Sequence, residues 1–189
     1  MDETTPRETE IKIPVPTLDT IRSLLPSVGG HQAHPSLREV NVLFDTEARD
    51  LDRQGRVLRL RRVGERQIVT MKGPAHFEGP IKHREELETG VGDIEVISAI
   101  FQRLGLQPVL RYEKDRESWR VGSVTVTLDH TPMGDFVELE GPAELLEALA
   151  TKIGADPAAG VRDSYVRLWQ MYRERHPELD LPHNMVFPE

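Results

Sequence analysis

Apolar and polar residues alternate with a period of two in several segments of the chain, which is the pattern of β-strands with one apolar face. In residues 8–15, for example, Glu8 and Glu10 fall on one face, and Ile11 and Ile13 fall on the other. Short turns join most of these segments, so neighbouring strands are predicted to run antiparallel. The predicted strands are residues 8–15, 39–45, 56–63, 67–72, 83–88, 109–119, 124–129 and 135–140.

Four other segments are predicted to be helices. Thr17 and Asp93 are suitable N-caps for the first two, and Gly105 ends the second. The predicted helices are residues 17–25, 93–104, 143–153 and 164–175; residues 28–37, 46–55 and 73–80 are predicted to be loops or turns, and the tail from His176 to be irregular. Because strands and helices do not alternate, the sequence predicts an α+β fold dominated by an antiparallel sheet that can close on itself.

Charged residues stand at positions i and i+2 on one face of five predicted strands. The sets are Glu8/Glu10/Lys12, Arg59/Arg61, Arg84/Glu86/Glu88, Lys114/Arg116 and Glu138/Glu140. This pattern has two interpretations. An open sheet with one solvated face carries such charges as a matter of course. A barrel with its apolar face outward, under the helices, would instead gather them in a tunnel, where charges need to pair with each other, with metals or with a charged ligand.

The composition narrows the function classes. The chain has 189 residues, of which 24 are basic and 32 acidic, a net charge of −8 and no cysteine. A general nucleic-acid binder would be basic, and disulfides, thiolate metal sites and cysteine nucleophiles are excluded. No apolar run reaches the roughly 18 residues of a membrane span, and the acidic start, residues 1–6, is unlike a signal peptide. We therefore expect a cytoplasmic protein that binds neither nucleic acid nor membranes.

A charge count is consistent with a tunnel that holds metals and a polyphosphate. The positions that would face a lumen are seven acids (Glu8, Glu10, Glu86, Glu88, Asp129, Glu138, Glu140) and seven bases (Lys12, Arg59, Arg61, Lys72, Arg84, Lys114, Arg116). Two divalent cations would add four positive charges, which roughly balance a triphosphate of charge about −4. Carboxylates suit Mg²⁺ or Mn²⁺, whereas arginine and lysine suit phosphate oxygens.

A series of motifs along nearly the whole chain resembles the CYTH superfamily, also called triphosphate tunnel metalloenzymes. Residues 8–12 (ETEIK) resemble its ExExK signature. The other matching segments are residues 43–46 (LFDT), 58–61 (LRLR), 70–74 (TMKGP), 84–88 (REELE), 114–116 (KDR), 126–129 (VTLD), 136–140 (FVELE) and 164–165 (SY). By these motifs together, the chain is identified as a member of this superfamily.

The resemblance implies an eight-stranded antiparallel β-barrel, the triphosphate tunnel, with helices packed outside. We expect a single domain over residues 1–175 and a C-terminal tail over residues 176–189. The implied cofactor is Mg²⁺ or Mn²⁺, held by Glu8, Glu10, Glu138 and Glu140, with Glu86, Glu88 and Asp129 as further candidates. The implied ligand is a triphosphate such as ATP or tripolyphosphate, bound by Lys12, Arg59, Arg61, Lys72, Arg84, Lys114 and Arg116, of which the first three are the candidate catalytic residues.

One position departs from the family pattern. A basic residue commonly precedes the late Ser-Tyr pair, whereas Asp163 stands there in this chain and Arg162 lies one position earlier. Either Arg162 replaces the missing phosphate contact or that contact is absent.

The superfamily includes class IV adenylyl cyclases, thiamine triphosphatases and inorganic triphosphatases. The TMKGP turn, the REELE strand and the stretch from Gly105 to Arg116 look most like class IV cyclases, which also suggests a homodimer. Val57 stands where the thiamine triphosphatases carry tryptophan, and the opening motifs of the bacterial inorganic triphosphatases are absent. The resemblance therefore favours conversion of ATP to cyclic AMP and pyrophosphate. Triphosphate hydrolysis is the alternative, and a non-catalytic phosphate or nucleotide binder is a third interpretation.

Overall fold

Residues 7–188, which the computed structural model describes, form nine strands and five α-helices. The acidic start that was predicted not to be a signal peptide, residues 1–6, lies outside the described residues. The strands are β1 (Arg7–Val15), β2 (His31–Asp45), β3 (Val57–Val63), β4 (Arg66–Lys72), β5 (His76–Glu78), β6 (Ile81–Gly90), β7 (Gln107–Val121), β8 (Val124–Thr131) and β9 (Gly134–Glu140). The helices are α1 (Leu18–Leu24), α2 (Asp50–Arg53), α3 (Ile94–Arg103), α4 (Ala143–Lys152) and α5 (Tyr165–Arg175), with 3₁₀ turns η1 (Leu25–Val28), η2 (Pro157–Ala159) and η3 (Pro177–Leu179).

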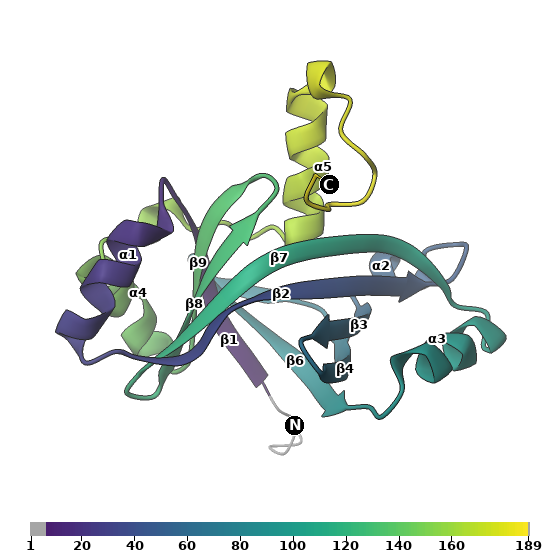
Figure 1. Ribbon diagram of the computed structural model, residues 1–189, viewed down its shortest axis with the longest axis horizontal. Coiled ribbons are helices and arrows are strands. Elements are labelled where there is room, and N and C mark those ends of the chain that lie inside the picture. Colours follow the sequence, from purple (N-terminus) through teal and green to yellow (C-terminus); the bar gives the residue numbers. More distant parts are fainter. Residues whose placement is uncertain (1–6, 189) are drawn as a thin grey trace.

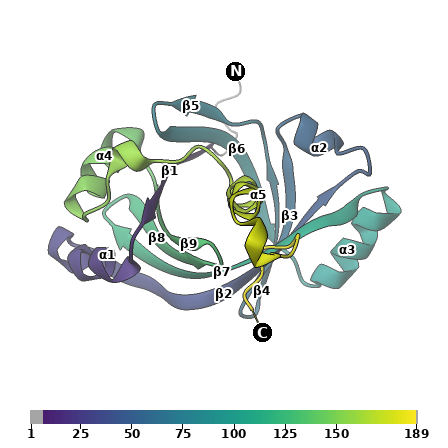
Figure 2. The ribbon, with the colours of Figure 1, turned by 90° about the horizontal axis from the view of Figure 1, so that it is seen from above.

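Eight of the strands form a closed antiparallel barrel in the order β1-β9-β8-β7-β2-β3-β4-β6 (Figures 1 and 2). Pairing of β1 with β6 completes the ring, and β5 makes a short hairpin with the start of β6. The helices lie outside the barrel. The predicted α+β architecture and its eight-stranded barrel are therefore confirmed.

Helices cover the outward faces of the strands because those faces are apolar. Ile11, Val126 and Leu139 from β1, β8 and β9 are fully buried in one cluster with side chains of α1 and α4. On the opposite side of the barrel, Phe44 and Leu60 from β2 and β3 pack under α3. Figure 2 shows these helices flanking the barrel on its two sides. Turning the apolar residues outward leaves the charged alternate positions to face inward.

The helix starts follow the predicted capping. Side chains of Thr17, Asp93 and Ser164 accept hydrogen bonds from backbone N–H groups in the first turns of α1, α3 and α5. These bonds satisfy donors that have no partner within the helix.

Three segments predicted as loops or turns contain regular structure, which corrects the sequence-based prediction. The strand β2 begins at His31, inside the predicted loop 28–37, and pairs with β7 as far as Arg120. Its register shifts between His34 and Leu37, around Pro35, which has no N–H to donate. Segments 46–55 and 73–80 contain α2 and β5. Long-range pairing thus stabilises strand structure that the local sequence does not specify.

The tail from His176 is irregular apart from η3, and its residues 183–187 contact the barrel. Met185 forms an isolated parallel bridge with Tyr112, and its carbonyl oxygen accepts from the N–H of Glu113 at 2.8 Å. Because β8 pairs with β7 only from Asp115 onward, the tail occupies an edge of β7 that β8 does not reach.

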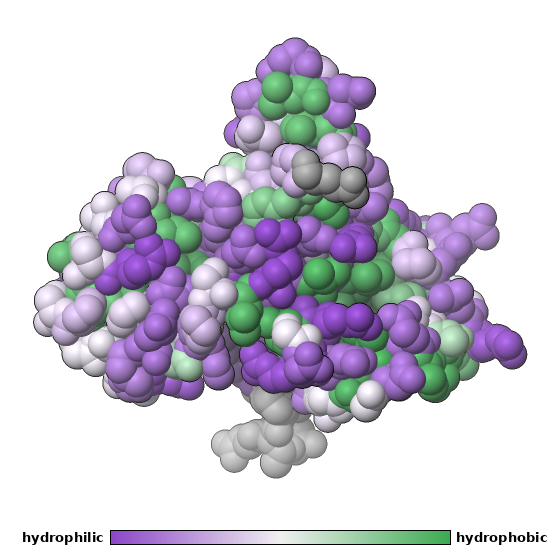
Figure 3. All heavy atoms as spheres, viewed as in Figure 1, coloured by the Kyte–Doolittle hydropathy of each residue, from purple (hydrophilic) through white to green (hydrophobic). Residues whose placement is uncertain are grey.

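Hydrophilic residues cover most of the face shown in Figure 3, with apolar patches between them. None of the helices within residues 7–188 has the length and apolar character that a membrane span requires.

Candidate active site

The inward side chains of the barrel surround a cavity of about 410 Å³. The strand register brings charged residues face to face: Glu10 lies opposite Glu140, and Lys12 lies opposite Glu138, where β1 pairs with β9. The charged residues that line the cavity are Arg7, Glu8, Glu10, Lys12, Asp52, Arg59, Arg61, Lys72, Lys82, Arg84, Glu86, Glu88, Lys114, Arg116, Glu138 and Glu140. The structure therefore agrees with the barrel interpretation of the charge pattern, not with an open sheet that has a solvated face.

Thirteen of the fourteen charged residues expected in the lumen line this cavity, and Asp129 is the exception. Asp129 is fully buried in the wall behind it. Its carboxylate accepts from Lys114 Nζ at 3.0 Å, from Arg116 Nε at 2.6 Å and from the Tyr165 hydroxyl at 2.6 Å. Asp129 thus orients two basic side chains from behind and does not face the cavity as expected.

Some charged and polar residues of the site were missed by the sequence analysis. Lys82 lies two positions before Arg84 on the same face of β6, so extending the alternation by one step identifies it. Glu39 and Asn41 show the same spacing on β2, where Glu39 is buried 3.4 Å from Arg61. Tyr165, noted from the sequence only as part of the Ser-Tyr motif, comes from α5, and no strand pattern could place it in the barrel.

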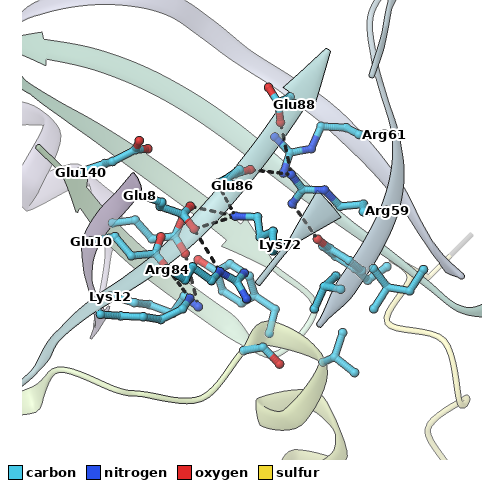
Figure 4. A pocket seen from close by; sticks show the side chains of 18 of the residues that line it. Glu8, Glu10, Lys12, Arg59, Arg61, Lys72, Arg84, Glu86, Glu88 and Glu140 are labelled. Atoms are coloured by element: carbon cyan, nitrogen blue, oxygen red, sulfur yellow. Dashed lines mark hydrogen bonds and ion pairs between the residues drawn. The ribbon is translucent and has the colours of Figure 1, made fainter. Parts of the chain in front are cut away.

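On the side of β1, β6 and β9, carboxylates crowd together and pair with basic side chains (Figure 4). Lys72 Nζ donates to Glu8 at 2.8 Å, and Arg84 Nε donates to the other oxygen of Glu8 at 3.1 Å. Lys82 pairs in the same way with Glu10. Burial opposes the ionisation of Glu8, but the neighbouring cations Lys72, Lys82 and Arg84 hold its pKa well below its usual value.

Glu140 differs from these paired carboxylates. It makes no hydrogen bond or ion pair with the side chains of residues 7–188, and Figure 4 shows it standing apart from the Glu8 cluster. Partial burial and the negative charges of Glu8, Glu10 and Glu86 raise the pKa of Glu140 to about 7. This side of the tunnel therefore carries more negative charge than its own cations neutralise.

The donor set suits a hard divalent cation. Within residues 7–188, no three acidic or histidine side chains converge closely enough to hold a metal ion. Glu8, Glu10 and Glu140 nevertheless supply the oxygen atoms that Mg²⁺ and Mn²⁺ prefer, and a cation would relieve the repulsion that raises the pKa of Glu140. Binding would require Glu8 and Glu10 to exchange a lysine or arginine partner for the metal.

On the side of β2, β3 and β7, basic groups crowd around Tyr112. Arg59 Nη1 lies 3.4 Å from the Tyr112 hydroxyl oxygen. Burial opposes ionisation of this phenol, but Arg59, Arg61 and Lys114 lower its pKa to about 8. Burial and the neighbouring Arg59 also lower the pKa of Arg61. An anionic ligand at this side would relieve the repulsion among the cations.

The start of α5 closes part of the barrel with Tyr165. The Nζ atoms of Lys12 and Lys114 lie 4.2 Å and 4.9 Å from the centre of its ring, within the range of cation–π attraction. Burial, together with the charges of Asp129 and Glu138, raises the pKa of Tyr165 well above its usual value. Tyr165 therefore stays a neutral donor to Asp129 and holds the two lysines near the ring.

Arg162, the candidate replacement for the basic residue expected at position 163, points to the β5–β6 hairpin in this structure. Its guanidinium donates from Nε and Nη2 to the carbonyl oxygen of Gly79, at 3.1 Å and 2.8 Å, and stacks over Phe77. Asp163 contributes its backbone carbonyl, which accepts from Lys12 Nζ at 3.3 Å. Arg162 thus fastens the β5–β6 hairpin and is not among the described residues that line the barrel cavity.

Comparison with known sequences supports the motif resemblance. A family model of the CYTH domain matches residues 6–155. Over 134 residues the chain is 29% identical to a putative adenylate cyclase of Methanocaldococcus jannaschii, an alignment that covers 70% of this chain and 75% of the relative.

Solved structures share the fold. The crystal structure of a putative adenylate cyclase from Vibrio parahaemolyticus superposes with a TM-score of 0.79 at 22% identity, covering 88% of this chain and 99% of the other. A putative adenylyl cyclase from Hippeastrum, described as having a dominant triphosphatase activity, superposes with a TM-score of 0.65 at 17% identity, covering 87% and 95% of the two chains. At these identities the likeness shows the barrel architecture alone.

Proposed function

Because the chain belongs to the CYTH domain family, we propose that it is a divalent-metal-dependent enzyme that acts on a triphosphate held in the barrel cavity. The observation that carries this proposal is the distribution of charge in the cavity. Its described lining has nine basic and seven acidic side chains on partly separate walls. A metal–triphosphate complex needs both: carboxylates for the cation and guanidinium or ammonium groups for the phosphates.

Glu8, Glu10, Glu138 and Glu140 would hold the Mg²⁺ or Mn²⁺. When bound, the cation would neutralise charge on the phosphate oxygens and stabilise the charge that develops during the reaction. Glu86 and Glu88 lie further along β6, where they face Lys72 and Arg59 at 2.8 Å and 3.5 Å. We therefore assign them to orienting these cations in the resting protein, with metal contact as a secondary role.

The basic side chains of the cavity would bind and orient the phosphates. Arg59 and Arg61 point inward from β3, and Lys12 lies across the lumen on β1 (Figure 4). Cations on both sides of a phosphate chain fix its position and stabilise the additional negative charge of the transition state. Lys72, Arg84, Lys114 and Arg116 complete this set of candidate phosphate ligands.

The favoured reaction is cyclisation of ATP to cyclic AMP and pyrophosphate, in line with the motifs and with the name of the Methanocaldococcus jannaschii relative. The ribose 3′-oxygen attacks the α-phosphorus, the bond from that phosphorus to the pyrophosphate oxygen breaks, and the hydroxyl proton passes to a base.

Hydrolysis is the second candidate, and the description of the Hippeastrum neighbour as a dominant triphosphatase favours it. There a water molecule attacks the terminal phosphorus of tripolyphosphate, a nucleoside triphosphate or thiamine triphosphate. The same cavity residues serve both reactions, since the outcome depends on which phosphorus meets the nucleophile.

Product analysis tests the proposal. The purified protein is incubated with ATP or with tripolyphosphate, each with Mg²⁺ and then with Mn²⁺, and the products are followed by phosphorus NMR and chromatography. Cyclic AMP with pyrophosphate supports the cyclase, and orthophosphate that forms fastest from tripolyphosphate supports the triphosphatase. Metal-dependent binding without any product would overturn both enzyme assignments and leave a phosphate-binding module.

A further inference from the structure

Thr70 lies in the wall of the barrel, between a basic and an acidic residue of the neighbouring strands. It is paired with Arg59 of β3 on one side and with Glu88 of β6 on the other. Directly opposed residues of antiparallel strands share one face of the sheet, so all three side chains point inward. Thr70 is nevertheless fully buried and is not among the residues that line the cavity. A ligand in the cavity would therefore contact Arg59 and not Thr70.

The hydroxyl of Thr70 forms two hydrogen bonds whose directions follow from the chemistry of its partners. A guanidinium has only donors, so Arg59 Nη2 donates to Thr70 Oγ1, at 3.1 Å. The single hydroxyl hydrogen is then available for Glu88, whose carboxylate accepts it at 2.9 Å. Because the side chain of threonine is β-branched, its rotation is restricted and the hydroxyl stays in this position.

Few other directed contacts hold the guanidinium of Arg59. Its Nη1 lies 3.4 Å from the Tyr112 hydroxyl oxygen, and its Nε has no hydrogen-bond partner within the described part of the chain. Glu86 and Glu88 approach Nη2 to 3.7 Å and 3.5 Å (Figure 4), distances that give attraction but no well-formed hydrogen bond. Of these contacts the bond to Thr70 is the shortest, so it contributes most to the direction of the guanidinium.

Arg61, two positions further along β3, is held by different residues. Its Nε donates to Asn41 Oδ1 at 2.9 Å, and its Nη1 lies 3.4 Å from Glu39. Both of these partners belong to β2. A change at Thr70 should therefore disturb Arg59 and leave Arg61 in place.

We propose that Thr70 is a positioning residue: its hydroxyl, itself oriented by Glu88, directs Arg59 toward the phosphates in the cavity. The proposal rests on the function proposed above, in which Arg59 is a phosphate ligand, and adds a residue that acts without touching the substrate. The carboxylates supply the charge that attracts Arg59, and the neutral hydroxyl supplies the direction. Arg59 therefore keeps its contact with Tyr112 only while Thr70 holds it.

The first measurement is an ultraviolet absorbance titration of Tyr112 in the protein without ligand. Burial raises the pKa of this phenol, but Arg59 and the nearby Arg61 and Lys114 lower it to about 8. Arg59 is the cation that contacts the phenol oxygen. The titration midpoint of Tyr112 therefore reports the position of Arg59 without requiring a substrate or turnover.

Thr70→Val removes the hydroxyl with little change of shape. The guanidinium should then move toward the carboxylates of β6 and away from Tyr112, so we expect the titration midpoint to rise by at least about half a pH unit. Thr127→Val is the matched control, because it also removes a buried hydroxyl from an inward position of the barrel. That hydroxyl has no hydrogen-bond partner within the described residues, and its loss should leave the midpoint unchanged.

The second measurement is the Kd for tripolyphosphate, determined by calorimetry with Ca²⁺ in place of Mg²⁺ or Mn²⁺. We expect Thr70→Val to raise this Kd about 5- to 10-fold and Thr127→Val to leave it within about 2-fold. Thr70→Ser keeps the hydroxyl, so it should retain the wild-type midpoint and a Kd within about 2-fold.

A further variant guards against loss of folding in Thr70→Val. Thr70→Ala also removes the hydroxyl but places no methyl group against the two charged neighbours, and we expect it to shift the midpoint and the Kd in the same directions. Thermal unfolding identifies the variants that are folded.

The outcomes separate this proposal from the proposed function. An unchanged Tyr112 midpoint in Thr70→Val and Thr70→Ala, or a shift in Thr70→Ser as large as theirs, would overturn the positioning role while the barrel assignment stands. A shifted midpoint with an unchanged Kd would show that the orientation of Arg59 does not serve phosphate binding, and would also overturn it. A wild-type protein that binds no tripolyphosphate with Ca²⁺, Mg²⁺ or Mn²⁺ would overturn the proposed function, and the midpoint would still decide whether Thr70 orients Arg59.

Discussion

Two acidic groups on different walls of the barrel, Glu140 and Tyr112, have pKa values that are shifted in opposite directions. On the β9 wall, burial and neighbouring carboxylates raise the pKa of Glu140 to about 7. On the β7 wall, the cations around Tyr112 overcome its burial and lower the pKa of its phenol to about 8. A formal charge count of the lining describes the cavity as nearly balanced, but the pKa values show that its charges are unevenly distributed.

This separation explains how one small cavity can suit both a cation and a polyanion. If every carboxylate were fully paired with a neighbouring cation, a ligand could bind only by breaking those ion pairs, and the lost attraction would weaken its binding. Glu8 and Glu10 are paired, but Glu140 on one wall and the cations around Tyr112 on the other still face like charges. A metal would relieve this repulsion on the first wall, and phosphates would relieve it on the second. The following four tests address this difference, from the largest expected effect to the smallest.

Glu140→Ala should abolish the excess of negative charge on the β9 wall. Because Glu140 has no partner among the described residues, the variant should fold normally and lose at least about 1,000-fold in metal-dependent turnover. Rates with Mg²⁺ or Mn²⁺ and the thermal midpoint are measured together. Glu147→Ala, at an exposed position of α4, is the control. A rate within 10-fold of wild type, which corresponds to a change of at most about 1.4 kcal/mol in the activation free energy, would contradict the metal assignment.

Asp129→Ala should destabilise the β7 wall of the barrel. The variant leaves Lys114, Arg116 and Tyr165 without their shared buried acceptor, so we expect the free energy of unfolding to fall by roughly 3–5 kcal/mol in urea titrations. Asp19→Ala breaks a surface pair with Arg22 and should cost less than about 1 kcal/mol. Similar losses in the two variants would show that Asp129 does not anchor the wall.

Arg61→Ala should weaken the basic wall without unfolding it. We expect the Kd for tripolyphosphate to rise about 10- to 100-fold and the Kd for orthophosphate to rise much less, because only the longer ligand spans the cavity. Arg62→Ala is the matched control, since the neighbouring side chain points outward and pairs with Glu95 at the surface. Equal losses for the two ligands would argue against a site that holds the whole phosphate chain.

Tyr112→Phe should remove an ionisation without a large loss of binding. The wild-type protein has three tyrosines, and one should become phenolate near pH 8, below the ordinary value of about 10, in an ultraviolet absorbance titration. The phenolate is favoured as the pH rises through 8, because it forms next to three cations. The step should vanish in Tyr112→Phe and persist in Tyr172→Phe. Its persistence in Tyr112→Phe would show that the β7 wall is less positive than we infer.

The strand pattern of the sequence predicted most of the barrel and its lining, because alternation is a local property. A strand at Glu8 or Lys114 needs only its own neighbours in the chain to show which side chains share a face. The same logic would have found Glu39 and Lys82 had the alternation been followed to the strand ends. The length of β2 could not be predicted, since residues from His31 are strand only through pairing with β7.

The accessibility and the orientation of individual side chains in the site depend on contacts between segments that are distant in sequence. Asp129 follows the inward alternation of β8, yet Tyr165 of α5 covers it, and the two are 36 positions apart in sequence. The conformation of Arg162 depends on Gly79, a further long-range contact. Local periodicity therefore predicts which residues face inward, but not which of them remain accessible.

The first strand of the barrel is also the one that completes it. β1 joins β6 on one side and β9 on the other, so Glu8 and Glu10 have no strand beside them on the ribosome until much later segments emerge. Domains with such distant pairings fold slowly and late in synthesis. A nascent chain that ends before β9 lacks Glu138 and Glu140, two of the four proposed metal ligands, and one of the two strands that pair with β1. The ability to capture a cation or a triphosphate would then arise in one step, at ring closure, and unfinished chains would not compete for either in the cell.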